Sequence, residues 1–142
     1  MKKIPSIMIV VWGIAVLCTL FLSSCKRPEV LDNSTLVNSA RNVALTFGPA
    51  YVPFFKEANV SDVQVFKKED YGDSRPQIRK QIGRKFYTVT FTYDSTAVKF
   101  DFGFAARVRI WKDTGEPLDV IFGNGWGRNF LFLSFKEQTN HS

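Results

Sequence analysis

The feature that most constrains the fold of this chain is a pair of stretches in which apolar and polar residues alternate. In residues 85–93, apolar and aromatic side chains alternate with Thr88, Thr90 and Thr92. A second stretch keeps seven apolar positions in phase, namely Val98, Phe100, Phe102, Phe104, Ala106, Val108 and Ile110. Because successive side chains of a strand point to opposite faces, both stretches predict strands with one apolar face.

The second stretch, residues 98–110, is longer than most strands. We therefore expect one long strand that bends at Gly103, where a bulge or kink costs least. The predicted core-facing residues are Phe100, Phe102 and Phe104, and the predicted outward-facing residues are Lys99, Asp101 and Arg107. On this interpretation the change Phe102→Ala costs about 3 to 5 kcal/mol. Arg107, Arg109 and Trp111 share the outward face.

Residues 35–47 have apolar positions at helical spacing, with Asn33 or Ser34 as the N-cap and Gly48-Pro49 as the stop. Residues 50–58 predict a second short helical turn that begins at Pro53. Further predicted elements are strands at 63–66, 118–122 and 129–135, turns at 94–96 and 113–116, and loops at 71–76 and 123–127. The sequence thus predicts an α+β fold, with an N-terminal helix packed on an antiparallel meander of about five strands.

This order of elements, a helix followed by a long bent antiparallel sheet, is similar to that of the NTF2-like and cystatin-like cone folds. The resemblance depends on element order and on no sequence motif. It implies a small domain in which the curved sheet can enclose a pocket.

The N-terminus has the organisation of an export signal. Met1-Lys2-Lys3 precedes an apolar run over residues 4–22, and small residues precede Cys25. The alternative is a membrane-spanning helix, but Pro5 and Gly13 interrupt the run and the chain turns polar soon after Cys25. We therefore expect residues 1–24 to be a signal peptide.

Leu22-Ser23-Ser24-Cys25 resembles the lipobox of bacterial lipoproteins. This resemblance implies that the Cys25 thiol receives a diacylglycerol and that signal peptidase II cleaves before it, so the chain would be held on a membrane by its lipid. Lys26 stands where an Asp usually retains Gram-negative lipoproteins in the inner membrane. By that analogy we expect a bacterial envelope protein on the outer membrane, facing the periplasm.

The remaining chain predicts a lipidated tether over 25–33, one domain over 34–136 and a polar tail over 137–142. The other cysteine, Cys18, lies within the signal, so no disulfide is expected after cleavage. Loss of Lys2 and Lys3 lowers the net charge by two from +6. This moderate basicity favours an acidic partner, and export argues against nucleic acid.

Few residues are suited to catalysis. The single histidine, His141, lies in the polar tail, which argues against a catalytic triad and against a zinc site. A carboxylate pair is the remaining enzymatic alternative, with the candidates Asp94, Asp101, Asp113, Glu116 and Asp119. These residues occupy predicted turns and a polar strand face, where solvated acids are usual. We expect no enzymatic activity and no cofactor.

Two segments are candidates for partner binding. The glycine-rich loop carries Trp126 and Arg128, residue types that are frequent in binding hot spots, although Trp126 can instead cap the end of the sheet. A basic run without acidic residues contains Arg75, Arg79, Lys80, Arg84 and Lys85. It predicts a docking surface for an acidic partner or a lipid headgroup, with a solvated loop or edge strand as the alternative.

These patterns together predict an envelope lipoprotein whose domain binds another macromolecule, as an accessory or assembly subunit of an envelope complex. The expected partners are the membrane, through the N-terminal lipid, and an envelope protein. The alternatives are an NTF2-like domain that binds a small ligand in a pocket, a binder of cell-wall glycan that uses Trp111 and Trp126, and a hydrolase.

Overall fold

The structure is a computed structural model, and it describes residues 31–70 and 75–131. The helical elements are α2 (Asn33–Phe47), the 3-10 helix η2 (Pro49–Phe54), the 3-10 helix η3 (Lys68–Asp70) and α3 (Pro76–Arg79). The strands are β1 (Ala58–Val60), β2 (Gln64–Val65), β3 (Lys85–Phe91), β4 (Ala106–Trp111), β5 (Pro117–Phe122) and β6 (Gly127–Asn129).

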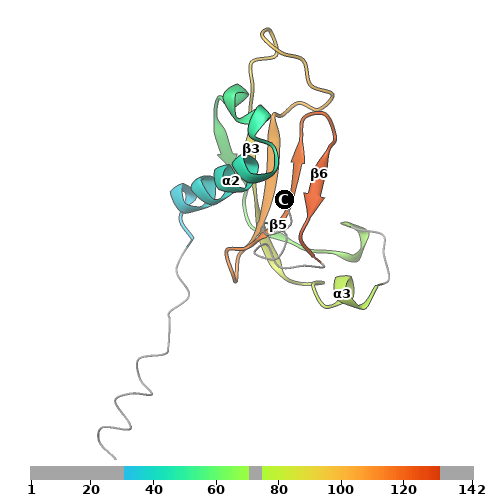
Figure 1. The fold of residues 1–142 in the computed structure, drawn as a ribbon. Coiled ribbons are helices and arrows are strands. Elements are labelled where there is room, and N and C mark those ends of the chain that lie inside the picture. The colour runs from blue at the N-terminus through green and yellow to red at the C-terminus, as the bar shows by residue number, and fades with distance from the viewer. Residues whose placement is uncertain (1–30, 71–74, 132–142) are drawn as a thin grey trace, which may run out of the picture. The chain divides into compact units, whose positions relative to one another are not determined.

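The strands form one six-stranded sheet in the order β1-β3-β4-β5-β6, and β2 pairs with β3 beside β1. Every pairing is antiparallel. Helix α2 crosses one face of this sheet, and the segment that contains α3 lies at the end where β3 begins (Figure 1). The predicted α+β fold, with an N-terminal helix on an antiparallel sheet that is largely a meander, is confirmed.

Helix α2 begins two residues earlier than the predicted residue 35. Its N-cap is Asp32, which accepts a hydrogen bond from the Thr35 backbone N–H at 2.7 Å, so the expected caps Asn33 and Ser34 are wrong. The helix ends at Phe47, before Gly48, as predicted. A Cβ at Gly48 would lie 2.3 Å from the Phe122 ring, so only glycine allows this close contact with the sheet. The next helical element, η2, begins at Pro49 rather than Pro53.

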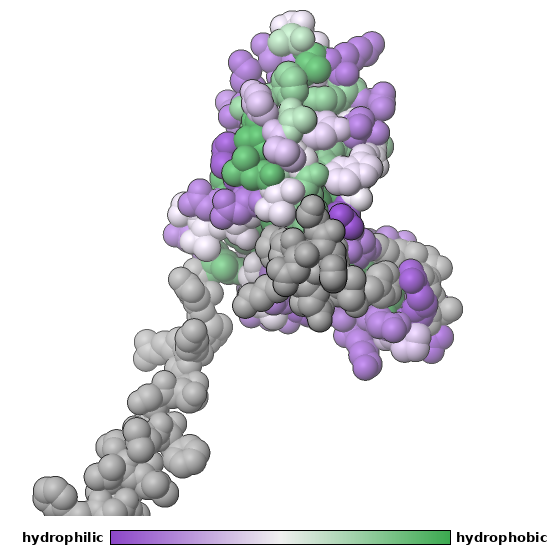
Figure 2. All heavy atoms as spheres, viewed as in Figure 1, coloured by the Kyte–Doolittle hydropathy of each residue, from purple (hydrophilic) through white to green (hydrophobic). Residues whose placement is uncertain are grey.

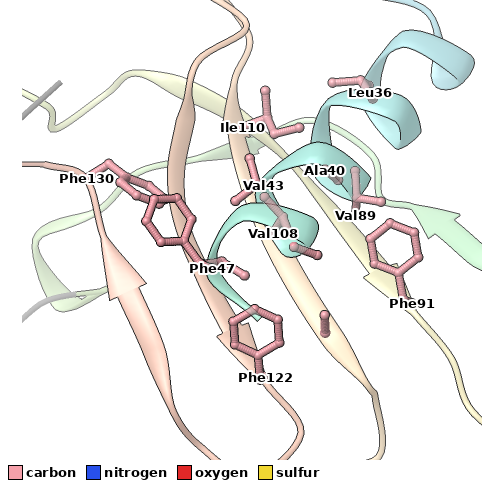
Figure 3. Packing of buried hydrophobic residues seen from close by; sticks show 13 residues of the cluster. Leu36, Ala40, Val43, Phe47, Val89, Phe91, Val108, Ile110, Phe122 and Phe130 are labelled. Atoms are coloured by element: carbon pink, nitrogen blue, oxygen red, sulfur yellow. The ribbon is translucent and has the colours of Figure 1, made fainter. Parts of the chain in front are cut away.

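The main core lies between α2 and the sheet (Figure 3). The helix contributes one apolar stripe that includes Leu36 and Phe47, and β3 contributes Val89 and Phe91, both fully buried. The predicted alternation of β3 is therefore confirmed, since these residues face the helix while Thr88 and Thr90 are on the other face. Burial of these side chains is the main source of stability.

A second core covers one end of the opposite sheet face. It contains Phe66, Ile78, Phe86, Trp111 and Leu118. The chain between β2 and β3 crosses this end of the sheet and provides Phe66 and Ile78. Trp111 is 5% exposed, so the expectation that it lies on an outward, wet face is wrong. On the strand face that Arg107, Arg109 and Trp111 share, only Arg107, at the start of β4, is exposed.

The predicted long strand over residues 98–110 is wrong, because β4 begins only at Ala106. Residues 98–105 form a loop in which Phe104 is buried, Phe100 is half-buried and Phe102 is 47% exposed. The predicted core position of Phe102, and the large cost of Phe102→Ala, are therefore wrong as well. Gly103 does not bend a strand here.

Several shorter predictions also differ from the structure. Strand β1 was not expected, and α3 occupies part of the predicted loop at 71–76. Strand β6 covers 127–129 instead of beginning at 129. The turns at 94–96 and 113–116 and the strand at 118–122 are confirmed. Residues 71–74, the signal and Cys25, and the chain after residue 131 lie outside the described residues.

Candidate functional site

One end of the sheet carries two sets of contacting aromatic rings, which together we call the aromatic end. The rings come from η2, from the loop that joins β3 to β4, and from the β5–β6 hairpin. Its members are Tyr51, Phe54, Tyr93, Phe100, Phe102, Phe104, Phe122 and Trp126. Tyr51 stacks on Phe122 with 4.6 Å between centroids, and Phe100 lies 4.8 Å from Tyr93. Offset and edge contacts of this kind hold rings in defined positions.

Three rings of the aromatic end reach the surface. Phe54, Phe102 and Trp126 are 40%, 47% and 46% exposed, and each comes from a different segment of the chain. In Figure 2 the hydrophobic spheres gather in the upper part of the view, where Figure 1 places η2 and the β3–β4 loop, whereas the lobe around α3 is mostly hydrophilic. Grouped exposed aromatic side chains mark interaction sites more often than scattered ones do.

Trp126 lies in the turn of the β5–β6 hairpin. Its backbone N–H donates to the Asn124 side chain at 3.1 Å, and Gly125 takes the positive φ of 83° that the turn requires. The indole stacks on Phe122 at 5.4 Å while nearly half of it faces solvent. Trp126 therefore caps the sheet and stays accessible at once. Arg128 lies apart from it, with its guanidinium 5.3 Å from the Phe47 ring centroid.

The structure divides the predicted basic run. Arg84 forms a two-point ion pair with Asp113, with Nη2–Oδ1 at 2.7 Å and Nε–Oδ2 at 3.0 Å, and its guanidinium lies 4.0 Å from the Trp111 ring centroid. This hydrogen-bonded pair holds the pKa of the Asp113 carboxyl below its ordinary range, through the Arg84 side chain first. Arg84 thus fixes the α3 segment to the β4–β5 turn.

The other basic residues of the run, Arg75, Arg79, Lys80 and Lys85, are exposed around α3 and the start of β3. They lie at the opposite end of the sheet from Trp126, because β3 begins where β5 begins and the hairpin follows the end of β5. The two ends are separated by about 17 Å, the five steps of about 3.3 Å that join the six residues of β4. The structure does not bring the basic run and Trp126 together.

The part of the second sheet face that the second core leaves open forms a groove of about 540 Å³. It is lined by Ser61, Gln64, Asp70, Phe86, Thr88, Thr90, Arg107, Arg109 and Ile121. Arg109 forms a two-point ion pair with Asp119, which is only 5% exposed. The groove therefore combines hydrogen-bonding side chains with apolar ones, as small-molecule sites do.

The carboxylates that the sequence offered for catalysis are spread over the fold. Asp113 and Asp119 pair with different arginines, and Asp94 accepts hydrogen bonds from Thr96 within its own turn. Within residues 31–70 and 75–131, no group of three or more potential ligands among His, Cys, Asp and Glu is placed to hold a metal ion. In the same described ranges no helix has the length and apolar character needed to cross a membrane.

Comparison with known proteins gives no relative: no protein-family model, no curated protein and no solved structure matches this chain. The candidate sites therefore depend on the geometry of the chain itself.

Sequence reasoning found Trp126 but missed the other parts of both candidate sites. Phe102 was placed in a core strand, and Phe54 was not considered. The groove residues Thr88, Thr90 and Arg107 were recognised only as the polar side of their strands. Antiparallel pairing of the two strands places Thr90 directly opposite Arg107. The polar residues of both strands were therefore the signal for this side of the groove.

Proposed function

We propose that this protein is a lipid-anchored component of a bacterial envelope whose domain binds a partner protein through the aromatic end. The anchor is Cys25 of the lipobox-like segment, and Lys26 favours the outer membrane with the domain in the periplasm. The domain acts by binding, as an accessory or assembly subunit, and not as an enzyme. The observation that carries the proposal is the exposure of Phe54, Phe102 and Trp126 at one end of the sheet, where each contacts another ring of the aromatic end.

The ring network suits docking because its exposed members are already held in place. Aromatic residues carry much of the energy of protein interfaces, and side chains that are ordered before binding lose little entropy on association. Trp126 rests on Phe122 and Phe102 on Phe104, with centroids 5.4 and 5.5 Å apart. Trp126 and Phe102 therefore each present one face to a partner without rearrangement.

The position of the aromatic end also fits a tethered protein. The described chain enters the domain at Leu31, next to the start of α2, and η2 at the other end of α2 contributes Tyr51 and Phe54 (Figure 1). The 15 residues of α2 extend over about 22 Å at 1.5 Å per residue. Residue 31 thus lies at the opposite end of α2 from the element that contributes Tyr51 and Phe54.

The docking surface is tested in living cells with a photo-cross-linking amino acid placed at Phe102. Leu45 is the matched control, since it is also 47% exposed but lies on the outer side of α2. We expect one defined cross-linked product from position 102, which disappears when Trp126→Ala is added. Equal products from both positions, or a product unaffected by Trp126→Ala, contradict docking at the aromatic end.

The kinetics of the purified pair separate the two predicted partner-binding segments. Trp126→Ala is expected to speed dissociation, because buried aromatic contacts set the lifetime of a complex. Charge reversal at Arg79 and Lys80 is expected to slow association and to weaken its salt dependence. Unchanged kinetics for Trp126→Ala would exclude the loop from the interface.

The anchor has a separate test. Cells fed a labelled fatty acid are expected to label the wild-type protein, whereas Cys25→Ala abolishes the label and leaves uncleaved precursor. Absence of label from the wild-type protein would remove the lipoprotein proposal and leave the docking result untouched.

The small-ligand alternative is favoured by a specific observation, the groove on the second sheet face. The glycan alternative loses one of its two tryptophans, because Trp111 is buried in the second core.

A further inference from the structure

The groove on the second sheet face holds one cation whose charge is not neutralised. Arg109 is paired with the buried Asp119. Arg107 has no carboxylate within ion-pair distance among the residues that the structure describes, and it is exposed. Its guanidinium lies 4.3 Å from the Phe104 ring centroid, an arrangement that orients the group by a cation–π contact.

Hydrogen-bond donors lie beside Arg107. Thr90 is its direct partner across the β3–β4 ladder, so the Thr90 hydroxyl and the guanidinium share the same face. Further along the groove, the Thr88 hydroxyl donates to the Gln64 side-chain oxygen at 2.7 Å. That bond engages the Gln64 side-chain oxygen, and the same amide group also carries two N–H donors.

We propose that this groove binds a small ligand with one carboxylate or phosphate group, whose oxygens accept hydrogen bonds from Arg107 and Thr90. A planar guanidinium is well suited to bind either group through two parallel hydrogen bonds. Ile121 and Phe86 supply apolar surface for the rest of the ligand. This site lies on a different face from the α2 core and does not depend on docking at the aromatic end.

Asp70 limits the charge of the ligand. It comes from η3, outside the sheet, and one of its oxygens accepts the Lys67 backbone N–H at 2.6 Å. A carboxylate on the wall of the groove repels additional negative charge. The ligand class is therefore a small anion with a single acidic group, and not a polyanion.

The test uses the full chain in detergent, labelled with 15N and titrated with sodium acetate or with inorganic phosphate. Sodium chloride at matched ionic strength is the reference. We expect saturable shifts of the backbone amide signals of Thr88, Thr90 and Arg107. A stronger response to acetate identifies the natural ligand as a carboxylate, and a stronger response to phosphate identifies it as a phosphate.

Paired variants give effects of opposite sign. Arg107→Gln is expected to weaken binding of the better anion at least about tenfold, since it removes the charged donor. Asp70→Asn is expected to strengthen it, because the repelling charge is lost while the acceptor for Lys67 remains. Arg41→Gln, at an exposed arginine on α2, which packs on the other face of the sheet, is the control and leaves binding unchanged.

Thermal unfolding checks that each variant is folded, which is expected because Arg107 and Asp70 are exposed. The proposal is overturned if neither anion gives saturable shifts, if Arg107→Gln binds as tightly as wild type, or if Asp70→Asn binds more weakly.

Discussion

Residues 85–91 form a central strand of the sheet, whereas residues 98–105 form a loop, although apolar and polar residues alternate in both. In β3 the alternation separates two faces, with Phe91 fully buried under α2 and Thr90 beside the groove. In the loop the same alternation gives three different environments, since Phe100 is half-buried, Phe102 exposed and Phe104 buried.

The difference lies in the neighbours that each segment finds. Strand β3 pairs with β4 on one side and with β1 and β2 on the other. Ala106 pairs with Phe91 and Phe122, which are the last residues of β3 and β5. The loop before Ala106 therefore has no strand on either side to pair with. The loop instead closes on the hairpin, where the Phe102 N–H donates to the Gly123 carbonyl at 2.9 Å. Alternation thus predicts which side chains share a face, while the length of neighbouring strands decides where a strand ends.

The comparison is tested first by Phe91→Ala, which removes a fully buried ring from β3. This ring stacks on Phe55 with 4.2 Å between centroids and lies in the main core. We expect a loss of about 3 to 5 kcal/mol in the free energy of unfolding, because the cavity cannot collapse under α2. Chemical denaturation measures the loss. A loss below about 1 kcal/mol is typical of surface substitutions and would contradict the burial of Phe91 under α2.

The second test, Gly123→Ala, separates the loop from the sheet. A Cβ at this position would lie 2.5 Å from the Phe104 carbonyl oxygen and 2.6 Å from the Phe100 ring. The loop must move to admit it, and we expect a loss of about 1 to 3 kcal/mol, as for other overpacked sites.

Gly103→Ala is the matched control for that variant. No atom lies within 4 Å of a Cβ built at Gly103, and its φ is not positive. We expect an unchanged free energy of unfolding. If both substitutions have equal effects, close packing of the loop on Gly123 does not hold it in place.

The physical reason for what the sequence could predict is local periodicity. The helix 33–47 buries one stripe, and β3 alternates the buried Val89 with the groove-lining Thr88 and Thr90, so spacing identifies both. The strand at 117–122 is buried on both faces and is recognised as a short apolar run between two turns. Strand β2 has only two residues, Gln64–Val65, but lies within the predicted strand at 63–66. Strand β1 has three residues that depend on the edge of β3, so no local pattern reveals it. The start of β4 differs from the prediction because it depends on where the neighbouring strands β3 and β5 end.

The candidate sites show the same limit. Trp126 was identified because a glycine-rich turn exposes whatever side chain it carries. Its neighbour Phe102 comes from another loop, and only the tertiary fold brings Phe102 to within 3.3 Å of a Cβ built at Gly125. Arg84, a residue of the predicted docking run, shows the same limit. Its partner Asp113 is 29 residues away, so the ion pair is not visible in the local sequence.

The third test, Phe102→Ala, makes in the loop the same change that Phe91→Ala makes in the strand. Phe102 is 47% exposed and contacts Phe104 at 5.5 Å, so we expect a loss of at most about 1 kcal/mol. Thermal unfolding of the two variants side by side measures the contrast. Equal losses would show that Phe102 is packed as tightly as a strand residue. Phe102 would then not be an exposed ring available for docking.

The smallest expected effect concerns the start of the connection between β3 and β4. Asp94 accepts hydrogen bonds from the Thr96 hydroxyl at 2.6 Å and the Thr96 N–H at 2.9 Å, and these bonds, the hydroxyl first, hold the pKa of Asp94 below its ordinary range. Because the folded pKa is depressed, the stabilisation is present above the unfolded pKa of about 3.9 and is lost as pH falls through the folded value. NMR titration of the carboxyl is therefore expected to give a lowered pKa that Thr96→Ala brings back toward 3.9. Lys56, 3.8 Å away, contributes less, so Lys56→Gln should raise the pKa by a smaller amount. A larger effect of Lys56→Gln would mean that charge, and not the turn, holds this end of the loop.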